Sequence, residues 1–263
     1  MADTDSGSWP LVAIMVAEDT SQAARARANE LADRLGVPIA TTPPEGSVLA
    51  LSCDDEGLSL IGGGLELRAD LADMLPRLAP ANLRRELLVR AARIKGAASE
   101  GQPLHAVDAT AGLGSDSLLL AASGFEVCMF ESNPVIAALL EDALRRASFH
   151  PNLTDIVRRM HLVVGDSVEA LPHVSPTPDV VYLDPMFPER KKSAAVKKKF
   201  QLLHRLERPC ANQEELLRAA LAAHPRKVVV KRPVKGPGLA GVKPSHVIAG
   251  KAVRYDCIVP PRS

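Results

Sequence analysis

Residues 183–188 read Leu-Asp-Pro-Met-Phe-Pro and follow an apolar run, Val-Val-Tyr-Leu, that is typical of a buried strand in a parallel sheet. Open α/β sheets bind ligands at the carboxyl ends of such strands. Asp184 offers oxygen acceptors, Pro185 lacks a backbone donor and can present its carbonyl, and Phe187 offers a flat face for stacking. This combination predicts a site that modifies an exocyclic nitrogen of a nucleobase. Because Asp-Pro is also a common turn pair, an ordinary β-to-α turn is the alternative.

A second segment carries residues that could bind a ligand. Residues 107–116 read Val-Asp-Ala-Thr-Ala-Gly-Leu-Gly-Ser-Asp and join a predicted strand to a predicted helix. Gly112 and Gly114 permit a tight turn and a close ligand approach, and the helix start adds free N–H groups. A dinucleotide site is one interpretation, but Ser117 stands where the Gly-x-Gly-x-x-Gly pattern needs its third glycine. Asp108 suits a cationic ligand, such as a sulfonium with an α-ammonium group, better than a pyrophosphate.

Acidic residues end four predicted strands in succession: Asp108, Glu131, Asp166 and Asp184. Any one of them could be a helix cap or a turn residue, whereas four together indicate a single binding crevice. Glu131 stands where an acid can accept hydrogen bonds from ribose hydroxyls. In a methyltransferase, the position of Asp166 reads the adenine amine. We therefore favour S-adenosylmethionine over a dinucleotide as the ligand.

Strands and helices alternate in the part of the chain that carries these acids, which predicts a doubly wound parallel sheet. A strand pair at the end of the chain, after five βα units, matches a class I methyltransferase, a Rossmann-like fold with a mostly parallel seven-stranded sheet. The predicted strands are residues 104–107, 126–130, 161–164, 180–183, 227–231, 247–248 and 252–259, and the helices are 116–123, 134–147 and about 196–206.

A small α+β unit precedes this pattern. It consists of a strand at 11–17, a helix from 23 to 35 with Thr20 as its cap, a hairpin of 48–53 with 58–61, and an edge strand at 65–68. A further helix is predicted over 82–94. We expect residues 1–75 to form a substrate-docking unit and residues 76–263 to form the methyltransferase domain.

The bulk properties exclude several classes of protein. The chain has 263 residues, 46% of them hydrophobic, and a formal net charge of +1, so a nucleic acid would need a local basic patch. Its four cysteines are widely spaced and indicate neither a zinc site nor a disulfide framework, which fits a reducing cytoplasm. We expect no bound metal and no membrane partner, because no apolar run approaches the ~20 residues of a membrane span.

With these motifs assembled, the chain resembles the RsmJ-type family of small-subunit rRNA guanine-N2 methyltransferases. The resemblance rests on residues 108–114, 131–134, 180–188, 191–198 and 228–233, and it covers about 85–259 well. It implies S-adenosylmethionine as methyl donor and a guanine amine near the 3′ end of 16S rRNA as acceptor, in naked rRNA or in the small ribosomal subunit. It implies cofactor contacts from Ser115, Asp116, Glu131, Ser132, Asp166, Ser167 and Asp184. The chain departs from the family at 78–85, where a glycine-rich basic stretch is expected.

Basic side chains follow the predicted base pocket and predict contacts with RNA phosphates: Arg190, Lys191, Lys192, Lys197 and Lys198. A solvated helix face is the alternative for that run. Lys231, at the end of the fifth strand, could contact the substrate or be an ordinary surface lysine. Arg84, Arg85, Arg90 and Arg93 form a second candidate patch.

Three other functions fit parts of the pattern. The same hydrogen-bond acceptors could bind an adenine amine or the side-chain amide of a protein glutamine. A degenerate methyltransferase fold could instead be a non-catalytic RNA-binding or assembly factor. A nicotinamide dehydrogenase fits the pattern less well than either. The intact glycine turn and the four strand-end acids favour the enzyme.

Overall fold

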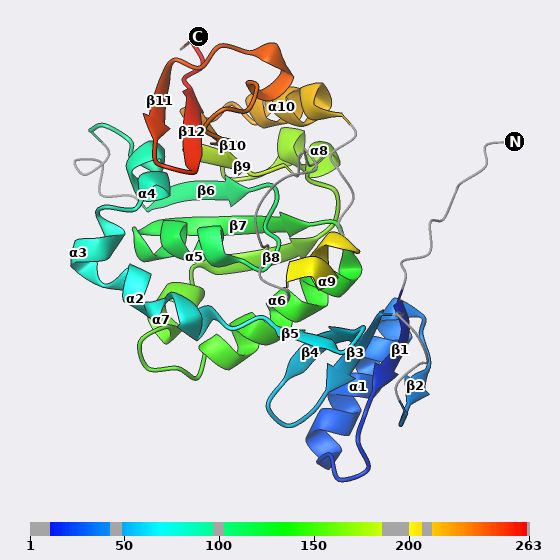
Figure 1. The fold of residues 1–263 in the computed structure, drawn as a ribbon. Helices are drawn as coiled ribbons and strands as arrows, with labels where there is room; N and C mark the ends of the chain where they lie inside the picture. The colour runs from blue at the N-terminus through cyan, green and yellow to red at the C-terminus, as the bar shows by residue number, and fades with distance from the viewer. Residues whose placement is uncertain (1–10, 43–48, 97–102, 186–199, 207–211, 262–263) are drawn as a thin grey trace, which may run out of the picture.

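The computed structural model describes residues 11–42, 49–96, 103–185, 200–206 and 212–261, which form two sheets with their helices (Figure 1). The smaller sheet has the strand order β2-β1-β3-β4-β5. Strand β1 is parallel to β2 and β3, and the β3–β4–β5 run is antiparallel. Its strands are β1 (Leu11–Met15), β2 (Ile39–Ala40), β3 (Leu49–Cys53), β4 (Leu58–Gly62) and β5 (Leu65–Arg68). The predicted hairpin and edge strand are confirmed.

Helix α1 (Gln22–Leu35) packs on this small sheet and begins one residue later than the predicted cap implies. Ser21, not Thr20, is the N-cap, because the Ser21 side chain accepts from the Ala24 N–H. The prediction of Thr20 was therefore wrong. Gly36 ends the helix in the left-handed conformation, as its position in the sequence indicates.

The larger sheet has the order β11-β12-β10-β9-β6-β7-β8 and confirms the class I methyltransferase fold. Strands β6 to β10 are parallel, and β12 pairs antiparallel with both β10 and β11. The strand order reverses between β6 and β9, the place where doubly wound sheets bind ligands. The strands are β6 (Leu104–Asp108), β7 (Phe125–Glu131), β8 (Met160–Val164), β9 (Val180–Leu183), β10 (Lys227–Pro233), β11 (His246–Ala249) and β12 (Val253–Ile258).

Helices cover both faces of the larger sheet (Figure 1). On one face lie α4 (Leu87–Ala92) and α5 (Ser115–Ala122); on the other lie α8 (Ser167–Ala170) and α10 (Gln213–Ala222). The remaining helical segments are η1 (Leu71–Met74), α2 (Leu75–Leu78), α3 (Pro80–Leu83), α6 (Pro134–Ala147), α7 (Thr154–Val157), η3 (Leu171–His173), α9 (Phe200–His204) and η4 (Leu239–Gly241).

The single helix predicted over residues 82–94 is wrong. The chain forms α3 and α4 instead, because Glu86 adopts an extended conformation and its carboxylate accepts two hydrogen bonds from Arg77, at 2.7 and 2.8 Å. Arg93 then ends α4 in an extended conformation. The Lys227 ammonium donates to the carbonyls of Ala91 and Arg93, at 2.8 and 2.7 Å, and so satisfies acceptors that a longer helix would have bonded internally.

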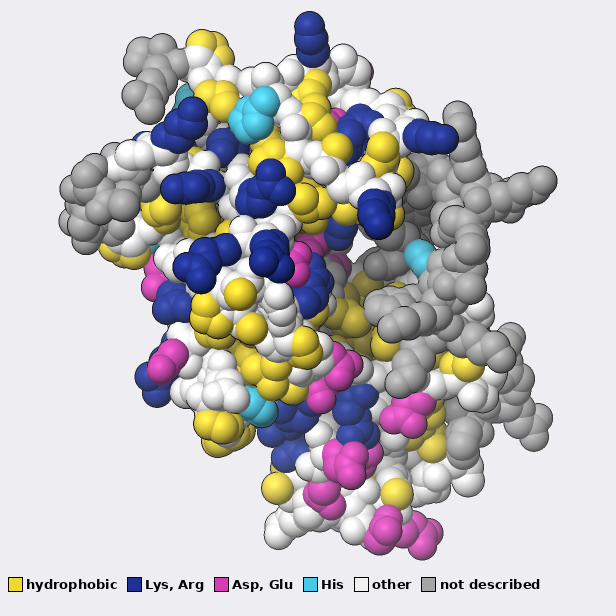
Figure 2. Space-filling view, turned by 60° about the vertical axis from the view of Figure 1, so that its left-hand side comes forward, with side chains coloured by type: hydrophobic (Ala, Val, Ile, Leu, Met, Phe, Trp, Pro, Cys, Tyr) yellow, Lys and Arg dark blue, Asp and Glu magenta, His cyan; other side chains and the backbone are white. Residues whose placement is uncertain are grey.

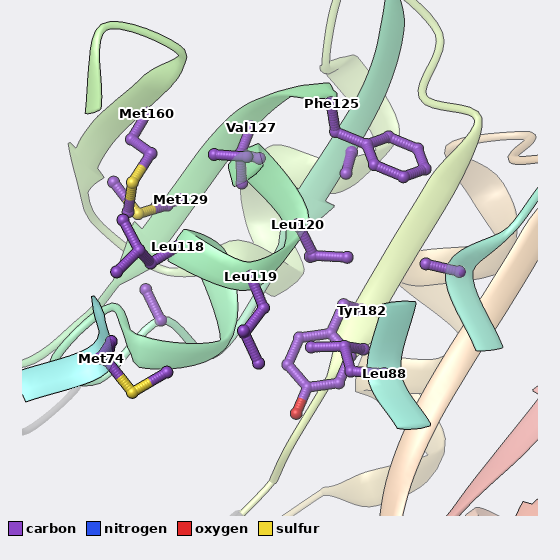
Figure 3. Close-up of a cluster of buried hydrophobic side chains, with 14 of the residues drawn as sticks. Met74, Leu88, Leu118, Leu119, Leu120, Phe125, Val127, Met129, Met160 and Tyr182 are labelled. Carbon is purple, nitrogen blue, oxygen red and sulfur yellow. The ribbon is translucent and has the colours of Figure 1, made fainter. Parts of the chain in front are cut away.

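Aliphatic and sulfur-containing side chains fill the core between α5 and the larger sheet (Figure 3). Leu118, Leu119 and Leu120 of α5 are fully buried against Val127 and Met129 of β7. The β9 strand is buried along its whole length, which fits a central parallel strand with helices on both faces. The apolar core thereby fixes the carboxyl ends of the central strands relative to the start of α5.

A separate core joins the small sheet to the larger one. Leu49, Leu51 and Leu60 of the small sheet pack in one cluster with Ile136 and Leu139 of α6. Ala69, Leu71 and Met74 belong instead to the core of the larger sheet, so the change from one core to the other falls near residue 69. The division at residue 75 stays a prediction. In the described part of the chain, no helix has the length and apolarity that a membrane span requires.

Replacing Leu139 with alanine is expected to destabilise both sheets together. Leu139 is fully buried in the shared core, and a Leu→Ala change in such a site costs about 2–5 kcal/mol. Urea denaturation followed by circular dichroism should show a single transition with a lower midpoint. Phe149→Ala is the control, because Phe149 is 80% exposed and its loss should change stability by less than about 0.5 kcal/mol. Two separate transitions in Leu139→Ala would contradict a shared core.

Candidate functional site

A cavity of about 1100 Å³ opens at the carboxyl ends of the central strands, beside the reversal between β6 and β9. Strand ends, the glycine turn, η1, α9 and the start of α8 all contribute to its wall. Nine of the ten residues predicted to bind the cofactor line it: Asp108, Gly112, Ser115, Asp116, Glu131, Ser132, Asp166, Ser167 and Asp184. The fold has therefore brought together acids that are up to 76 positions apart in the sequence.

Asp108 ends β6 and is almost entirely enclosed, with 1% of its surface exposed. Its carboxylate accepts from the Thr110 N–H at 3.1 Å and from the Ser117 hydroxyl at 2.5 Å. Burial raises the pKa of Asp108 to about 7, against the lowering effect of these two hydrogen bonds. The side chain therefore ties the glycine turn to the start of α5, and its charge depends on pH near neutrality.

Gly112 and Glu131 connect the first two strand ends. The Gly112 N–H donates to Glu131 at 2.9 Å, and the Asn133 N–H donates to the other carboxylate oxygen at 2.8 Å. Burial raises the pKa of Glu131, and the backbone donors oppose that rise. These two bonds fix the direction of the carboxylate and leave lone-pair positions for ligand hydroxyls.

Gly114 is the one predicted cofactor residue that does not line the cavity among the described residues. It is the N-cap of α5 with φ +77°, and a β-carbon there would lie 2.6 Å from Leu140 of α6. The positive φ requires glycine at this position, and the end of the Leu140 side chain would have to move for a β-carbon.

The third strand end contributes an acid that is open to solvent. Asp166 is exposed and caps α8 by accepting from the Val168 N–H at 2.8 Å. Ser167 is buried beside it, whereas Ser132, after β7, is exposed. Asp166 thus combines a structural role at the helix start with free acceptor capacity toward the cavity.

Lys231 connects two acids of the site. Its ammonium lies 2.8 Å from Asp116 on α5 and 2.8 Å from Asp184 after β9, and its side chain is only 25% exposed. The reading of Lys231 as an ordinary surface lysine is therefore wrong. The two carboxylates raise its pKa despite the opposing effect of burial, so Lys231 stays charged. The Tyr182 hydroxyl donates to the same Asp116 oxygen at 2.6 Å.

Asp184 and Pro185, the described part of the predicted catalytic motif, both line the cavity. The Asp184 N–H donates to the Thr110 hydroxyl at 2.7 Å, which links the loop after β9 to the turn after β6. Burial raises the pKa of Asp184, while the Lys231 ammonium lowers it and Asp116 raises it further. The carboxylate is thus half-buried, open toward the cavity, and held next to a positive charge.

The remaining predicted residues lie outside the described part of the chain. They are the stacking residue Phe187 and the basic residues Arg190, Lys191, Lys192, Lys197 and Lys198. Their roles stay predictions.

Three residues of the site were not singled out from the sequence. Tyr182 and Thr110 stand within the quoted motifs, but nothing in their spacing indicates that they bond Asp116 and Asp184. Arg77 lines the cavity from a segment that carries no motif. Helix α10 was also left out, although Asn212 followed by Gln-Glu-Glu-Leu-Leu is a recognisable helix start, confirmed by the Asn212 side chain accepting from the Glu215 N–H.

Comparison with known proteins gives matches along nearly the whole chain. Residues 47–260 match the family model described as "Putative SAM-dependent methyltransferase". The ribosomal RNA small subunit methyltransferase J of Thioalkalivibrio sulfidiphilus is 42% identical over 247 residues, 91% of this chain and 95% of that protein. The protein of the same name from Neisseria meningitidis serogroup C is 38% identical over 85% of this chain and 88% of its own length.

A solved structure shows the same architecture. The crystal structure of a SAM-dependent methyltransferase from Neisseria gonorrhoeae superposes with a TM-score of 0.72 and 31% identity, covering 95% of this chain and 96% of that one. The fold, the strand-end acids and these matches define the class as S-adenosylmethionine-dependent methyltransferases with a class I fold. Within that class, the chain belongs to the ribosomal RNA small subunit methyltransferase J family.

The buried carboxyl of Asp108 gives a pH-dependent prediction. Its folded pKa, about 7, lies above the ordinary value of 3.8, so the folded state holds its proton more tightly than the unfolded state. The contribution of Asp108 to the free energy of unfolding therefore falls as the pH rises from about 4 through 7. Asp108→Asn cannot ionise, so the difference in unfolding free energy between the variant and the wild type should shift in favour of the variant from pH 5 to pH 8. Urea denaturation at both pH values measures this shift, and a constant difference would show that Asp108 does not titrate there.

Proposed function

We propose that this protein transfers a methyl group from S-adenosylmethionine to the exocyclic N2 of a guanosine near the 3′ end of small-subunit (16S) rRNA. Membership in the family supports the reaction class and the rRNA substrate. The observation that carries the proposal is the position of Asp184 at the end of β9, inside the cavity and in contact with Lys231. An acceptor fixed at that point can bind and orient a planar amine.

The lining of the cavity fits S-adenosylmethionine. Glu131, with its direction set by two backbone donors, suits the ribose hydroxyls, and the exposed Asp166 with its neighbour Ser167 suits the adenine amine. The glycine turn and Ser115 at the start of α5 offer backbone N–H groups to the carboxylate end of the ligand. Asp116 and Asp184 are the acids available to its positive groups. When bound, S-adenosylmethionine supplies an electrophilic methyl carbon on a sulfonium.

Asp184 and the Pro185 carbonyl would accept hydrogen bonds from the two protons of the guanine amine. The lone pair of that amine is delocalised into the ring, so acceptors that fix its protons also fix the direction in which the nitrogen can react. We assign Asp184 as the group that receives the displaced N2 proton, directly or through solvent. Phe187 would stack on a base turned out of its helix.

Lys231 acts as a positioning residue in this mechanism. Its ammonium holds the Asp184 carboxylate in place and favours its ionised form, which accepts hydrogen bonds and offers none. Asp116, supported by the Tyr182 hydroxyl, anchors the other side of the ammonium. The guanine amine therefore meets an acceptor whose orientation is set by β10 and α5 before the RNA arrives.

The first test identifies the methylated nucleoside. Purified protein is incubated with methyl-labelled S-adenosylmethionine and small ribosomal subunits from cells that lack the enzyme, and the digested RNA should carry label in N2-methylguanosine. A parallel reaction with naked rRNA determines which form is the substrate. Label in N6-methyladenosine or in protein would replace the proposed acceptor, and loss of S-adenosylmethionine binding would favour a non-catalytic role.

Replacing Asp184 with alanine should lower kcat by about 100-fold or more, because the amine loses an acceptor that orients it. The rate is measured at saturating S-adenosylmethionine, so that weaker cofactor binding does not contribute. Asp184→Asn keeps one acceptor oxygen and should retain more activity than Asp184→Ala. Asp155→Ala, which removes an acid that is 86% exposed on α7, is the control and should leave kcat unchanged. Near-wild-type turnover by Asp184→Ala would refute the assignment.

The pH dependence of kcat separates positioning by Lys231 from a purely structural role. Because the ammonium lowers the pKa of Asp184, its removal in Lys231→Met should raise that pKa and move the acid limb of the profile to higher pH. Asp116, Asp108 and Arg232 also act on this carboxyl and remain in the variant. Lys231→Arg keeps the charge and should restore the profile toward wild type. A lower kcat with an unmoved acid limb would leave Lys231 a structural role only.

A further inference from the structure

The near-zero net charge of the chain hides a strong separation of charge. Residues 76–96 carry six basic residues and one acidic residue, and residues 227–263 carry eight basic residues and one acidic residue. Residues 1–75 carry four basic and thirteen acidic residues. The two basic segments therefore hold a net +12, and the first 75 residues hold a net −9, in a chain whose total is +1.

The fold packs the two basic segments against each other. Helix α4 contacts β11 and β12, and the Lys227 ammonium bonds the carbonyls at the end of α4. At the other end of α4, Leu87 lies so close to Gly250 that a β-carbon on Gly250 would come within 2.6 Å of it. Helix α4 thus lies along the edge strand of the larger sheet.

We use the term basic face for six exposed side chains on these two segments: Arg84, Arg85, Arg90, Arg93, Lys95 and Lys251. The opposite side of α4, with Leu88, Ala91 and Ala92, is buried in the core, so Arg90 must point outward. Among the residues that the structure describes, no member of the basic face forms a salt bridge with a carboxylate. The two nearby acids, Glu86 and Asp256, are already paired with Arg77 and Arg254.

Figure 2 shows the consequence at the surface. Lys and Arg side chains gather over the end of the molecule that carries α4 and the β11–β12 hairpin, and acidic side chains gather at the far end of the small sheet. Six like charges that form no salt bridge within the described part of the chain repel one another and lower the stability of the isolated protein. Such a face gains most from a polyanion, and arginine is the side chain that binds phosphate oxygens with two parallel hydrogen bonds.

The basic face is continuous with the catalytic cavity. Arg77 lines that cavity and also a smaller hollow of about 340 Å³ that includes Asn82, Arg85 and Leu87. Arg85 therefore lies next to the rim formed by Arg77. A polymer bound along α4 would pass the mouth of the cavity, where a single extruded base could enter.

We infer that the basic face of α3, α4 and the β11–β12 turn binds the phosphate backbone of the RNA that presents its guanine to the cavity. This inference rests on the proposed function. It places the phosphates away from the first 75 residues, whose net −9 repels a polyanion, and so argues against the substrate-docking role that the sequence suggested for that unit.

Neutralising the basic face should reduce the salt dependence of RNA binding. The test measures fluorescence anisotropy of a labelled RNA hairpin copied from the 3′ end of small-subunit rRNA, over a range of salt concentrations. The double variant Arg90→Gln/Arg93→Gln and the quadruple variant that adds Arg84→Gln and Arg85→Gln are compared with wild type. Each lost phosphate contact should make the slope of log Kobs against log [salt] shallower by about 1, so the quadruple variant should lose about 4.

A matched control removes the same charge elsewhere. Arg158→Gln/Arg218→Gln changes two exposed arginines away from the basic face, the C-cap of α7, which pairs with Asp155, and a residue of α10, and should leave the slope unchanged. S-adenosylmethionine binding, measured by calorimetry, should be equal in all variants and reports that the fold is intact. Unchanged affinity and slope in the quadruple variant would overturn the inference, as would binding to anionic lipid vesicles in preference to the RNA hairpin.

The same variants separate failure of this inference from failure of the proposed function. If the wild type binds RNA through the basic face but places no methyl group on guanine, the surface stands and the proposed reaction is wrong. If the wild type forms N2-methylguanosine and the quadruple variant does so with the same KM for RNA, the reaction stands and the surface is wrong. A raised KM for RNA with little change in kcat is the result expected when both are right.

Discussion

The ammonium of Lys231, held between Asp116 and Asp184, is the interaction on which the site depends. It joins three elements that meet only in the folded state: the start of α5, the loop after β9 and the end of β10. Asp108, Asp116 and Asp184 lie together in a largely enclosed space. Without a nearby cation, their mutual repulsion would favour protonation of at least one of them. Lys231 offsets that repulsion and keeps the acceptor of the proposed base site charged. The cost is a buried ion network, in which removal of one partner leaves an unpaired charge.

In the turn after β6, the polar side chains also bond one another. Asp108 uses its oxygens on Thr110 and Ser117, and the Thr110 hydroxyl in turn accepts from the Asp184 N–H. The first and fourth strand ends are therefore linked through one threonine. Such a connected network fixes the width of the crevice before any ligand binds, which is what a site that works by positioning requires.

Separation of charge complements this rigid centre. The acidic small sheet and the basic face lie on different parts of one molecule, and their charges nearly cancel in the total. A polyanion approaching such a molecule is attracted at one end and repelled at the other, so the field orients it before contact. The shared apolar core of α6 with the small sheet keeps the acidic unit fixed relative to the site.

The sequence by itself determined the succession of strands and helices along the larger sheet, the class I fold and the acids at the strand ends, because buried parallel strands and glycine turns leave strong local patterns. Nine of the ten residues that it assigned to cofactor binding line the cavity. The Ser21 cap could not be decided from the sequence, because Thr20 and Ser21 are neighbours and both residue types cap helices well. The break between α3 and α4 was also missed, because helix propensity is similar across residues 82–94 and the pairing of Glu86 with Arg77, nine positions earlier, leaves no local pattern. Likewise, nothing near Lys231 in the chain indicates its partners, which lie 115 and 47 positions away. Only the tertiary structure decided those contacts, because an ion pair between distant segments depends on how the sheet aligns its strand ends, not on the residues that flank it.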